Sequence, residues 1–139
     1  YYQRAAEYAA KKGVYMGIEN HGGPISGSPE LCAELFRKVG NPYAGILYEP
    51  CNLAAAGVDY KRAFDVMRDY ITHVHVKDAY PIDGTVQRVW LGTGMIDYRW
   101  VVASVEGLGY EGDYALEYEL HDEEPETAIG KWLDWFQKI

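Results

Sequence analysis

The sequence predicts an α/β fold in which parallel strands alternate with helices, and within that class about half of a (β/α)8 barrel. Three observations support this prediction. Apolar, β-branched stretches of strand length alternate with longer helix-forming stretches, a pattern typical of βα units. Each predicted strand has an ionisable residue near its C-terminal end. The 139 residues contain four such strands, whereas a complete barrel of eight strands needs roughly 250 residues.

The first half of the chain is predicted to form two helices and two strands. Tyr1–Lys12 is rich in Ala, Glu, Lys and Arg, which favour a helix, and Gly13 ends it. Val14–Glu19 and Ala44–Glu49 are predicted strands because apolar side chains alternate between their faces. The stretch Ser28–Val39 begins with a typical N-cap followed by Pro, and we expect a helix there.

The second half continues the alternation. Asp59 is a predicted cap for a helix to about Tyr70, and a strand over Thr72–Asp78 follows. Ala79–Ile96 contains one Pro and three Gly and is predicted to be a long loop, a feature that is often functional. The remaining predicted elements are a helix over Asp97–Glu106, a strand over Tyr114–Tyr118 and a helix that begins at Pro125.

The loop after the first strand argues for a barrel rather than an open, doubly wound sheet. A doubly wound sheet that binds a dinucleotide has the motif G-x-G-x-x-G at this position. Asn20–Pro24 reads Asn-His-Gly-Gly-Pro and does not match it. In a barrel the helices lie outside, and the inward face of the strands leads to a site at their C-terminal ends. We expect residues 1–139 to form a single domain, a partial barrel.

Composition and charge restrict the expected partners and compartment. The formal net charge of −8 at pH 7 argues against nucleic acid, whose phosphates are bound by clustered Lys and Arg. No apolar run could span a bilayer and no signal-peptide pattern opens the chain, so we expect no membrane partner. The two cysteines form no disulfide framework, which favours a reducing, cytoplasmic compartment. The chain begins with Tyr rather than Met, and we expect it to be part of a longer protein.

The ionisable residues at the strand ends are candidate metal ligands. One residue on each strand lies on the face away from the apolar side chains: Glu19, Glu49, His75 and Glu117. In a barrel that face points inward, so three carboxylates and one imidazole would converge. Without a cation the carboxylates would repel one another and take up protons. One divalent metal resolves this conflict, and three oxygens with one nitrogen suit Mn²⁺, Mg²⁺, Co²⁺ or Zn²⁺ without choosing among them.

Each of these residues also has a simpler interpretation. A Glu at a strand end is usually a solvated charge at the edge of a loop. His73 and His75 share a face of their strand, and they could instead be a hydrogen-bonded pair in the core. The same feature on all four strands favours the metal site.

Three segments of the sequence resemble a known family. GVYMGIENH, ITHVHVKD and LGTGMIDYRWVVASVEGLGYEGDYALEYE are similar to the second half of the xylose-isomerase-like TIM barrels. That family includes sugar and sugar phosphate isomerases and epimerases, inosose dehydratases and, more distantly, apurinic endonucleases. The resemblance covers nearly the whole chain, from the helix before strand five to the helix after strand eight.

The resemblance implies a metal site and an acid–base pair. One divalent metal would be held by Glu19, Glu49, His75 and Glu117. Glu49 departs from the family, which usually has Asp there, so it is the least secure ligand. In the epimerases the first and last of these glutamates also exchange protons on opposite faces of the substrate. Glu19 and Glu117 would then be the catalytic pair of a sugar isomerase or epimerase that works through an enediolate, with the metal polarising substrate oxygens.

Five residues near the site are candidates for contact with a small sugar or sugar phosphate. Asn52 stands where relatives have His or Asn in contact with substrate or with a second metal. Lys77 could meet a substrate oxygen, and Trp90 could stack on a sugar ring. The alternatives are a solvated strand-end charge for Lys77 and packing on the barrel rim for Trp90. The other two candidates lie in loops: His21 and Arg88.

Three other functions stay open. A dehydratase or lyase acting on an inosose or keto-sugar would use the same metal and base and would remove a β-hydroxyl. Two observations argue against an apurinic endonuclease. The net charge is negative, and the Asp-x-His that this family has in the loop after strand seven is absent from this sequence. A half barrel could also be an inactive or assembly fragment. It could pair with a second copy as a homo-oligomer or with a missing N-terminal half, because proteins avoid unpaired sheet edges.

Overall fold

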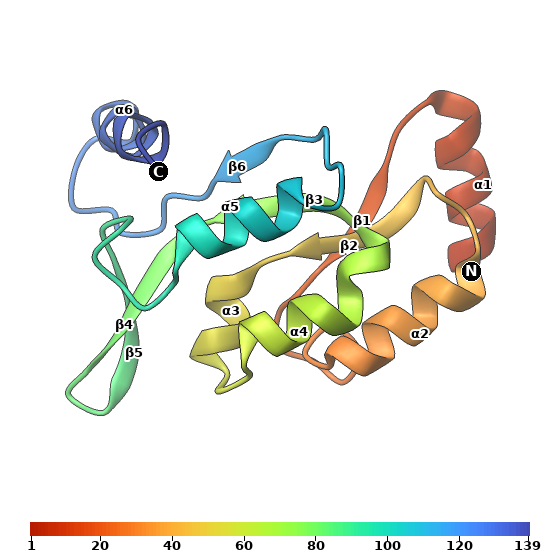
Figure 1. Cartoon of the computed structure of the whole chain (residues 1–139), viewed down its shortest axis with the longest axis horizontal. Helices are drawn as coiled ribbons and strands as arrows, with labels where there is room; N and C mark the ends of the chain where they lie inside the picture. Colours follow the sequence, from red (N-terminus) through yellow and green to blue (C-terminus); the bar gives the residue numbers. More distant parts are fainter.

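The computed structural model describes residues 1–139, and its centre is a parallel sheet of four strands (Figure 1). In spatial order the strands are β1 (Met16–Glu19), β2 (Ala44–Tyr48), β3 (Ile71–Val76) and β6 (Tyr114–Leu116). Each strand is hydrogen-bonded in parallel to its neighbour. The predicted α/β class with parallel strands is therefore confirmed. β1 begins two residues later than predicted, and β6 ends two residues earlier.

The longer helices lie along one side of the sheet and at the two ends of the molecule (Figure 1). They are α1 (Tyr2–Lys12), α2 (Pro29–Val39), α4 (Tyr60–Met67), α5 (Tyr98–Glu106) and α6 (Pro125–Phe136). A single turn of 3₁₀ helix, Arg68–Tyr70, joins α4 to β3. None of the helices has the length and apolar character needed to cross a membrane.

One face of the sheet is buried beneath the helices, and the other face is open. Tyr48 of β2 is fully buried, and its hydroxyl donates to the carbonyl oxygen of Tyr60 in α4 at 2.8 Å. Val74 and Val76 of β3 are also fully buried, whereas His73 and His75 remain partly exposed. The strand alternation therefore directs the ionisable residues to the open face.

Side-chain caps begin three of the helices where the sequence predicted them. Ser28 Oγ accepts the backbone N–H of Leu31 at the start of α2. Asp59 accepts two backbone N–H groups at the start of α4, and Asp97 accepts that of Trp100 at the start of α5. Each cap satisfies donors that the first turn of a helix leaves free, which explains why these boundaries could be read from short polar residues.

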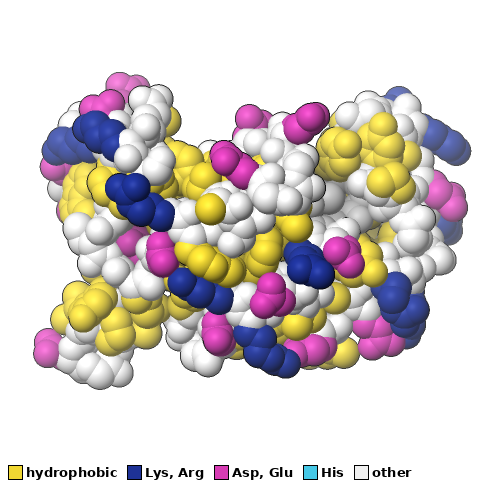
Figure 2. Space-filling model, in the orientation of Figure 1, with side chains coloured by type: hydrophobic (Ala, Val, Ile, Leu, Met, Phe, Trp, Pro, Cys, Tyr) yellow, Lys and Arg dark blue, Asp and Glu magenta, His cyan; other side chains and the backbone are white.

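The predicted long loop over Ala79–Ile96 is wrong, because most of it forms a hairpin. β4 (Asp78–Ile82) and β5 (Thr85–Val89) pair antiparallel. They turn at Asp83 and Gly84, both with positive φ, and an Asp-Gly pair is a strong signal for such a turn. The hairpin projects from the body of the molecule (Figure 1). It exposes apolar side chains, visible at the lower left of Figure 2: Tyr80, Ile82 and Val86.

A short helix follows β2 where the sequence predicted only the end of a strand. α3 spans Pro50–Ala55, with Pro in its first turn. Glu49, predicted as the last residue of the strand, is instead the N-cap of this helix, and its Oε1 accepts the N–H of Cys51 at 2.8 Å. The capping bond fixes one end of the Glu49 carboxylate and leaves its other oxygen free to face the open side of the sheet.

Candidate metal centre

Four side chains from four neighbouring strands meet at one end of the sheet. Glu19 is the last residue of β1, Glu49 follows β2, His75 is in β3 and Glu117 follows β6. One ligand atom of each residue lies within 4.8 Å of the ligand atoms of the others. The strands are parallel, so their C-terminal ends are at the same edge, and the structure brings together the four residues predicted as ligands. Their role as ligands stays a prediction.

The convergence of these side chains depends on a curved sheet. Neighbouring strands lie about 4.8 Å apart, so the outer strands of a flat four-stranded sheet would be about 14 Å apart. The Glu19 and Glu117 carboxylates come from the two outer strands, yet both lie within 4.8 Å of the shared cluster. The sheet therefore has to bend toward its open face, as a barrel wall does, for the two carboxylates to meet.

His75 is at the centre of the cluster. Its Nδ1 lies 3.1 Å from Glu117 Oε2, 3.9 Å from Glu19 Oε1 and 3.9 Å from Glu49 Oε2. A single ring nitrogen thus faces all three carboxylates. The neutral imidazole offers a lone pair on one nitrogen, so the same position suits either a hydrogen bond or a metal.

Glu49 provides the clearest indication of a cation-binding site. The side chain is fully buried, and its Oε2 has no hydrogen-bond partner. Burial, together with the negative charges of Glu117 and Glu19, raises the pKa of Glu49 to about 8, although the positive charge of Lys77 opposes this shift. A buried carboxylate oxygen without a partner is costly. A divalent cation would satisfy this oxygen, so the residues present fit the ion that the resemblance implies.

The longer side chain of Glu49 does not keep it from the cluster. The family usually has Asp at this position, which made Glu49 the least secure of the predicted ligands. In the structure Oε1 caps α3, and Oε2 lies 3.9 Å from His75 Nδ1 and 3.8 Å from Lys77 Nζ. The extra methylene therefore allows one carboxylate both to cap a helix and to face the site.

Lys77 lies behind the cluster rather than in solvent. Its side chain is 2% exposed, and Nζ donates to Glu117 Oε2 at 2.6 Å and lies 3.2 Å from Glu119 Oε2. Burial lowers the pKa of Lys77, but the hydrogen bond to Glu117 and the charge of Glu49 outweigh burial and raise it overall. The residue is therefore a buried ammonium ion held among carboxylates, and its predicted contact with a substrate oxygen stays a prediction.

Asn52 and Arg88 connect the cluster to the hairpin. Asn52, in α3, donates from Nδ2 to Glu19 Oε1 at 3.0 Å and accepts from Arg88 Nη2 at 2.9 Å. Arg88, in β5, donates from Nε to Glu119 Oε2 at 2.7 Å. Glu119 was not predicted as a site residue, and these contacts link it to both cations of the site, Arg88 and Lys77.

Asp78 is a second residue of this region that the sequence analysis missed. It is 1% exposed, and its carboxylate accepts four backbone N–H groups, those of Ala79, Gly92, Gly94 and Ile96. These bonds hold the base of the hairpin and the segment that follows it against the end of β3. The sequence did contain a signal for this role of Asp78. The residue directly follows the His-x-His-x-Lys motif, and a carboxylate at the end of a strand can accept hydrogen bonds from the loop that follows.

The other two candidates for substrate contact, His21 and Trp90, form no hydrogen bond with the four clustered residues. His21 is exposed in the loop after β1. Trp90 donates from its indole nitrogen to Asp122 Oδ2 at 2.9 Å, and its ring lies 6.2 Å from that of Trp132 in α6. The environment of Trp90 thus favours packing on the barrel rim, the alternative raised for it.

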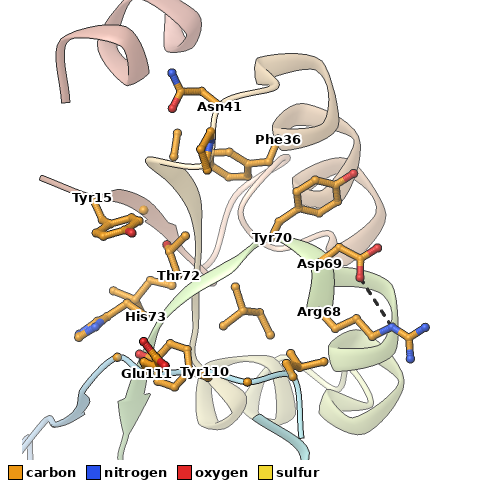
Figure 3. A pocket seen from close by; sticks show the side chains of 18 of the residues that line it. Tyr15, Phe36, Asn41, Arg68, Asp69, Tyr70, Thr72, His73, Tyr110 and Glu111 are labelled. Atoms are coloured by element: carbon orange, nitrogen blue, oxygen red, sulfur yellow. Dashed lines mark ion pairs between the residues drawn. The ribbon is translucent and has the colours of Figure 1, made fainter. Parts of the chain in front are cut away.

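A hollow of about 1100 Å³ lies on the open side near the N-terminal ends of the strands (Figure 3). Aromatic side chains, among them Tyr15, Phe36 and Tyr70, line it together with His73 of β3. None of the four clustered residues is among its lining residues. The hollow is therefore separate from the candidate metal centre, although His73, which lines it, also packs its ring edge-on against that of His75 at 5.5 Å.

Comparison with known proteins identifies the fold family. The chain matches the family described as xylose isomerase-like TIM barrel over residues 2–139. It is 25% identical over 134 residues to the L-ribulose-5-phosphate 3-epimerase UlaE of Salmonella paratyphi C (strain RKS4594), covering 96% of this chain and 46% of that protein. It is 24% identical over 131 residues to the inosose dehydratase of Geobacillus thermodenitrificans (strain NG80-2), covering 84% of this chain and 44% of that protein.

Solved structures agree with this assignment. A xylose isomerase-like TIM barrel protein from Mycobacterium smegmatis, in complex with magnesium, matches with a TM-score of 0.81 at 16% identity, over 98% of this chain and 47% of that one. The chain spans about half the length of the curated relatives it matches. The predicted partial (β/α)8 barrel is confirmed, and the chain belongs to the xylose isomerase-like TIM barrel family.

Proposed function

We propose that this chain forms the metal-binding half of the active site of a sugar isomerase or epimerase. The observation that supports the proposal best is the buried Glu49 Oε2, which has no hydrogen-bond partner and faces His75 and two further carboxylates. The similar curated proteins are a sugar phosphate epimerase and an inosose dehydratase. Glu19, Glu49, His75 and Glu117 would hold one divalent ion, for which Mn²⁺, Mg²⁺, Co²⁺ and Zn²⁺ all suit the ligand set.

The two outer glutamates are the proposed proton-transfer groups. A bound divalent ion would supply electrostatic polarisation of the carbonyl and hydroxyl oxygens of a sugar. Glu19 and Glu117 come from opposite edges of the sheet, so they reach a substrate between them from two sides. One would remove a proton next to the carbonyl, and the other would return a proton to the opposite face of the enediolate. Lys77 donates to Glu117 Oε2 and so orients that carboxylate.

Substrate contacts are proposed for the side chains around this pair. Asn52 and Lys77 each donate to one of the two glutamates, so a sugar hydroxyl bound at these glutamates would lie within reach of both. His21 is exposed in the loop beside Glu19 and is proposed to meet the substrate from outside. Arg88 and Trp90 stay predicted contacts, and their present partners are protein groups.

Closure of the site requires more of the barrel than this chain provides. β1 and β6 are the outer strands and have no partner on their outer edges, and the inner face of the sheet is open. We propose that a second four-stranded half, either an N-terminal half of the same polypeptide or a second copy of this chain, completes the barrel. That half would cover the hollow in Figure 3 and supply the remaining loops that choose the sugar.

Metal content tests the proposed site directly. We expect the purified chain to retain about one equivalent of divalent metal by mass spectrometry after loading with Mn²⁺ and desalting. Glu117→Gln should lose the metal and keep the far-UV circular dichroism of the wild type. Glu7→Gln is the matched control, because Glu7 is exposed on α1. A wild-type chain that binds no Mn²⁺ at millimolar concentration would refute the metal centre.

A second candidate function is dehydration of an inosose or keto-sugar, which the similarity to an inosose dehydratase favours. The same base would remove a proton next to the carbonyl, but a β-hydroxyl would then leave as water. The products distinguish the two reactions. An epimerase exchanges the substrate proton with D₂O and gives a diastereomer by NMR, whereas a dehydratase gives an unsaturated or deoxygenated ketone and releases water.

A further inference from the structure

Arg88 connects the hairpin to both outer strands of the sheet. Each of its three nitrogens donates to a protein acceptor: Asn52 Oδ1 at 2.9 Å, Glu119 Oε2 at 2.7 Å and Cys51 Sγ at 3.3 Å. We infer that Arg88 is a positioning residue that holds the two outer candidate ligands, Glu19 and Glu117, close to the other two. This role rests on the proposed metal-dependent function, and it differs from direct contact with substrate.

The first connection runs through Asn52 to β1. The Asn52 amide donates from Nδ2 to Glu19 Oε1 and to the carbonyl oxygen of Asn20, both at 3.0 Å. Its Oδ1 accepts from Arg88. Both ends of the amide are therefore engaged, and it cannot turn away from Glu19 without also losing the bond to Arg88. Fixing the guanidinium thus fixes the amide that holds the Glu19 carboxylate.

The second connection runs through Glu119 and Lys77 to the residue after β6. Glu119 Oε2 accepts from Arg88 Nε and lies 3.2 Å from Lys77 Nζ. Lys77 in turn donates to Glu117 Oε2 at 2.6 Å. Because the Lys77 side chain is only 2% exposed, water cannot replace Glu119 as a partner for its ammonium group. The position of Glu119, which Arg88 fixes, therefore governs how Lys77 holds Glu117.

These connections oppose a force that would otherwise open the cluster. Glu19 and Glu117 belong to strands at opposite edges of the sheet, so no backbone hydrogen bond links their positions directly. Like charges at this separation repel, most strongly when the site lacks a cation. One planar guanidinium engages both connections at once, whereas a lysine at the same position has a single nitrogen and could not reach Asn52 and Glu119 in this geometry.

Mn²⁺ affinity and coordination test this role without relying on turnover. Isothermal titration gives the Kd of the full 139-residue chain for Mn²⁺. The electron paramagnetic resonance linewidth in ¹⁷O-enriched water counts the water molecules bound to the ion. The variants are Arg88→Ala and Arg88→Lys, and Gln87→Ala is the control. Gln87 is the preceding residue of β5, is exposed, and its side chain donates only to Thr85 Oγ1.

We expect Arg88→Ala to weaken Mn²⁺ binding about 10- to 100-fold, the usual effect of removing a partner that orients metal ligands. It should also add at least one water to the bound ion, because a loosened glutamate leaves the metal. Arg88→Lys should retain the fold and still bind more weakly than the wild type, and Gln87→Ala should match the wild type in Kd and water count.

Two results would overturn the role of Arg88. One is an unchanged Kd and water count in Arg88→Ala. The other is an Arg88→Lys variant that binds Mn²⁺ with the Kd of the wild type. This second result decides the question if Arg88→Ala does not fold. Failure of the wild-type chain itself to bind Mn²⁺ is a different outcome: it refutes the proposed metal centre and the inference with it. Wild-type binding with no effect of either Arg88 variant refutes the inference alone.

Discussion

Removal of the Asp78 carboxylate should cost the protein a large part of its stability. This side chain lies at the junction of β3 and the hairpin and is 1% exposed. Its Oδ1 accepts the N–H groups of Ala79 and Ile96 at 3.0 and 3.2 Å, and its Oδ2 accepts those of Gly92 and Gly94 at 3.1 and 2.9 Å. Asp78→Ala leaves all four donors without an acceptor.

The cost follows from the burial of these donors. The Ala79 and Ile96 N–H groups are buried, so each loses its bond without replacement by water, whereas the two glycine N–H groups are partly buried and regain some hydration. An unsatisfied buried donor costs about 1–3 kcal/mol, so we expect Asp78→Ala to lose about 3–5 kcal/mol. Asp78→Asn keeps one oxygen as the acceptor for two of the N–H groups and places an amide NH₂ opposite the other two. We expect this variant to lose about 2–3 kcal/mol of unfolding free energy.

Urea unfolding followed by far-UV circular dichroism measures both losses, with Asp65→Ala as the control. Asp65 is exposed on α4, where Ala favours the helix, so its replacement should change the free energy of unfolding by less than about 0.5 kcal/mol. The reasoning is refuted if Asp78→Ala unfolds within that same margin of the wild type. It is also refuted if hydrogen exchange of the segment after the hairpin is as slow in Asp78→Ala as in the wild type.

Three further predictions address other parts of the chain. The pKa of Glu49 is raised by burial to about 8 from a usual 4.5. The protonated form is thus favoured in the fold, and the stability it contributes to the metal-free protein is complete below pH 4.5 and lost as the pH rises through 8. A cation must displace that proton to bind, so the Mn²⁺ association constant measured by calorimetry should rise about tenfold per pH unit up to pH 8 and stay constant above it. An association constant that does not change with pH would contradict this prediction. Gly94→Ala should lower the thermal midpoint because the added Cβ would clash with the Asp78 carboxylate and the carbonyl oxygen of Ala79. Gly130→Ala, where the added Cβ meets no atom within 4 Å, should raise the thermal midpoint slightly. Burial, with the nearby charge of Glu49, raises the pKa of the Cys51 thiol to about 12. We therefore expect this thiol to react with a disulfide reagent at pH 8 only after the protein unfolds. Rapid modification of the native chain would show that the thiol is accessible.

The parts of the fold that the sequence predicted depend on local patterns. Helix starts at Ser28, Asp59 and Asp97 could be recognised because an N-cap acts on donors within three residues of itself. The parallel strands were recognisable because one face of each is apolar. The hairpin was missed because its strands are exposed and mixed in character, although the Asp-Gly pair at 83 and 84 was a sufficient turn signal.

The four clustered residues were predictable because each lies near the C-terminal end of a strand or directly after it. Glu19 and His75 take their direction from strand alternation, so their faces follow from sequence alone. Arg88 and Glu119 are 31 residues apart in sequence and meet only because the fold brings Arg88 of β5 beside the segment that follows β6. Pairings of this kind depend on tertiary geometry, and neither residue has a local pattern that would identify its partner.

The charges around the cluster also bear on which ion the site accepts. Four carboxylates lie at this end of the sheet, those of Glu19, Glu49, Glu117 and Glu119, and two cations, Lys77 and Arg88, contact them. With His75 neutral, two negative charges remain unbalanced when all four carboxylates are ionised. A divalent ion balances them, whereas a monovalent ion leaves one negative charge unbalanced and a trivalent ion adds one positive charge. In the metal-free protein, protonation of Glu49 can partly replace the ion because it removes one of the two unbalanced negative charges. Protonation therefore explains how the Glu49 carboxyl group can be buried although its Oε2 has no hydrogen-bond partner.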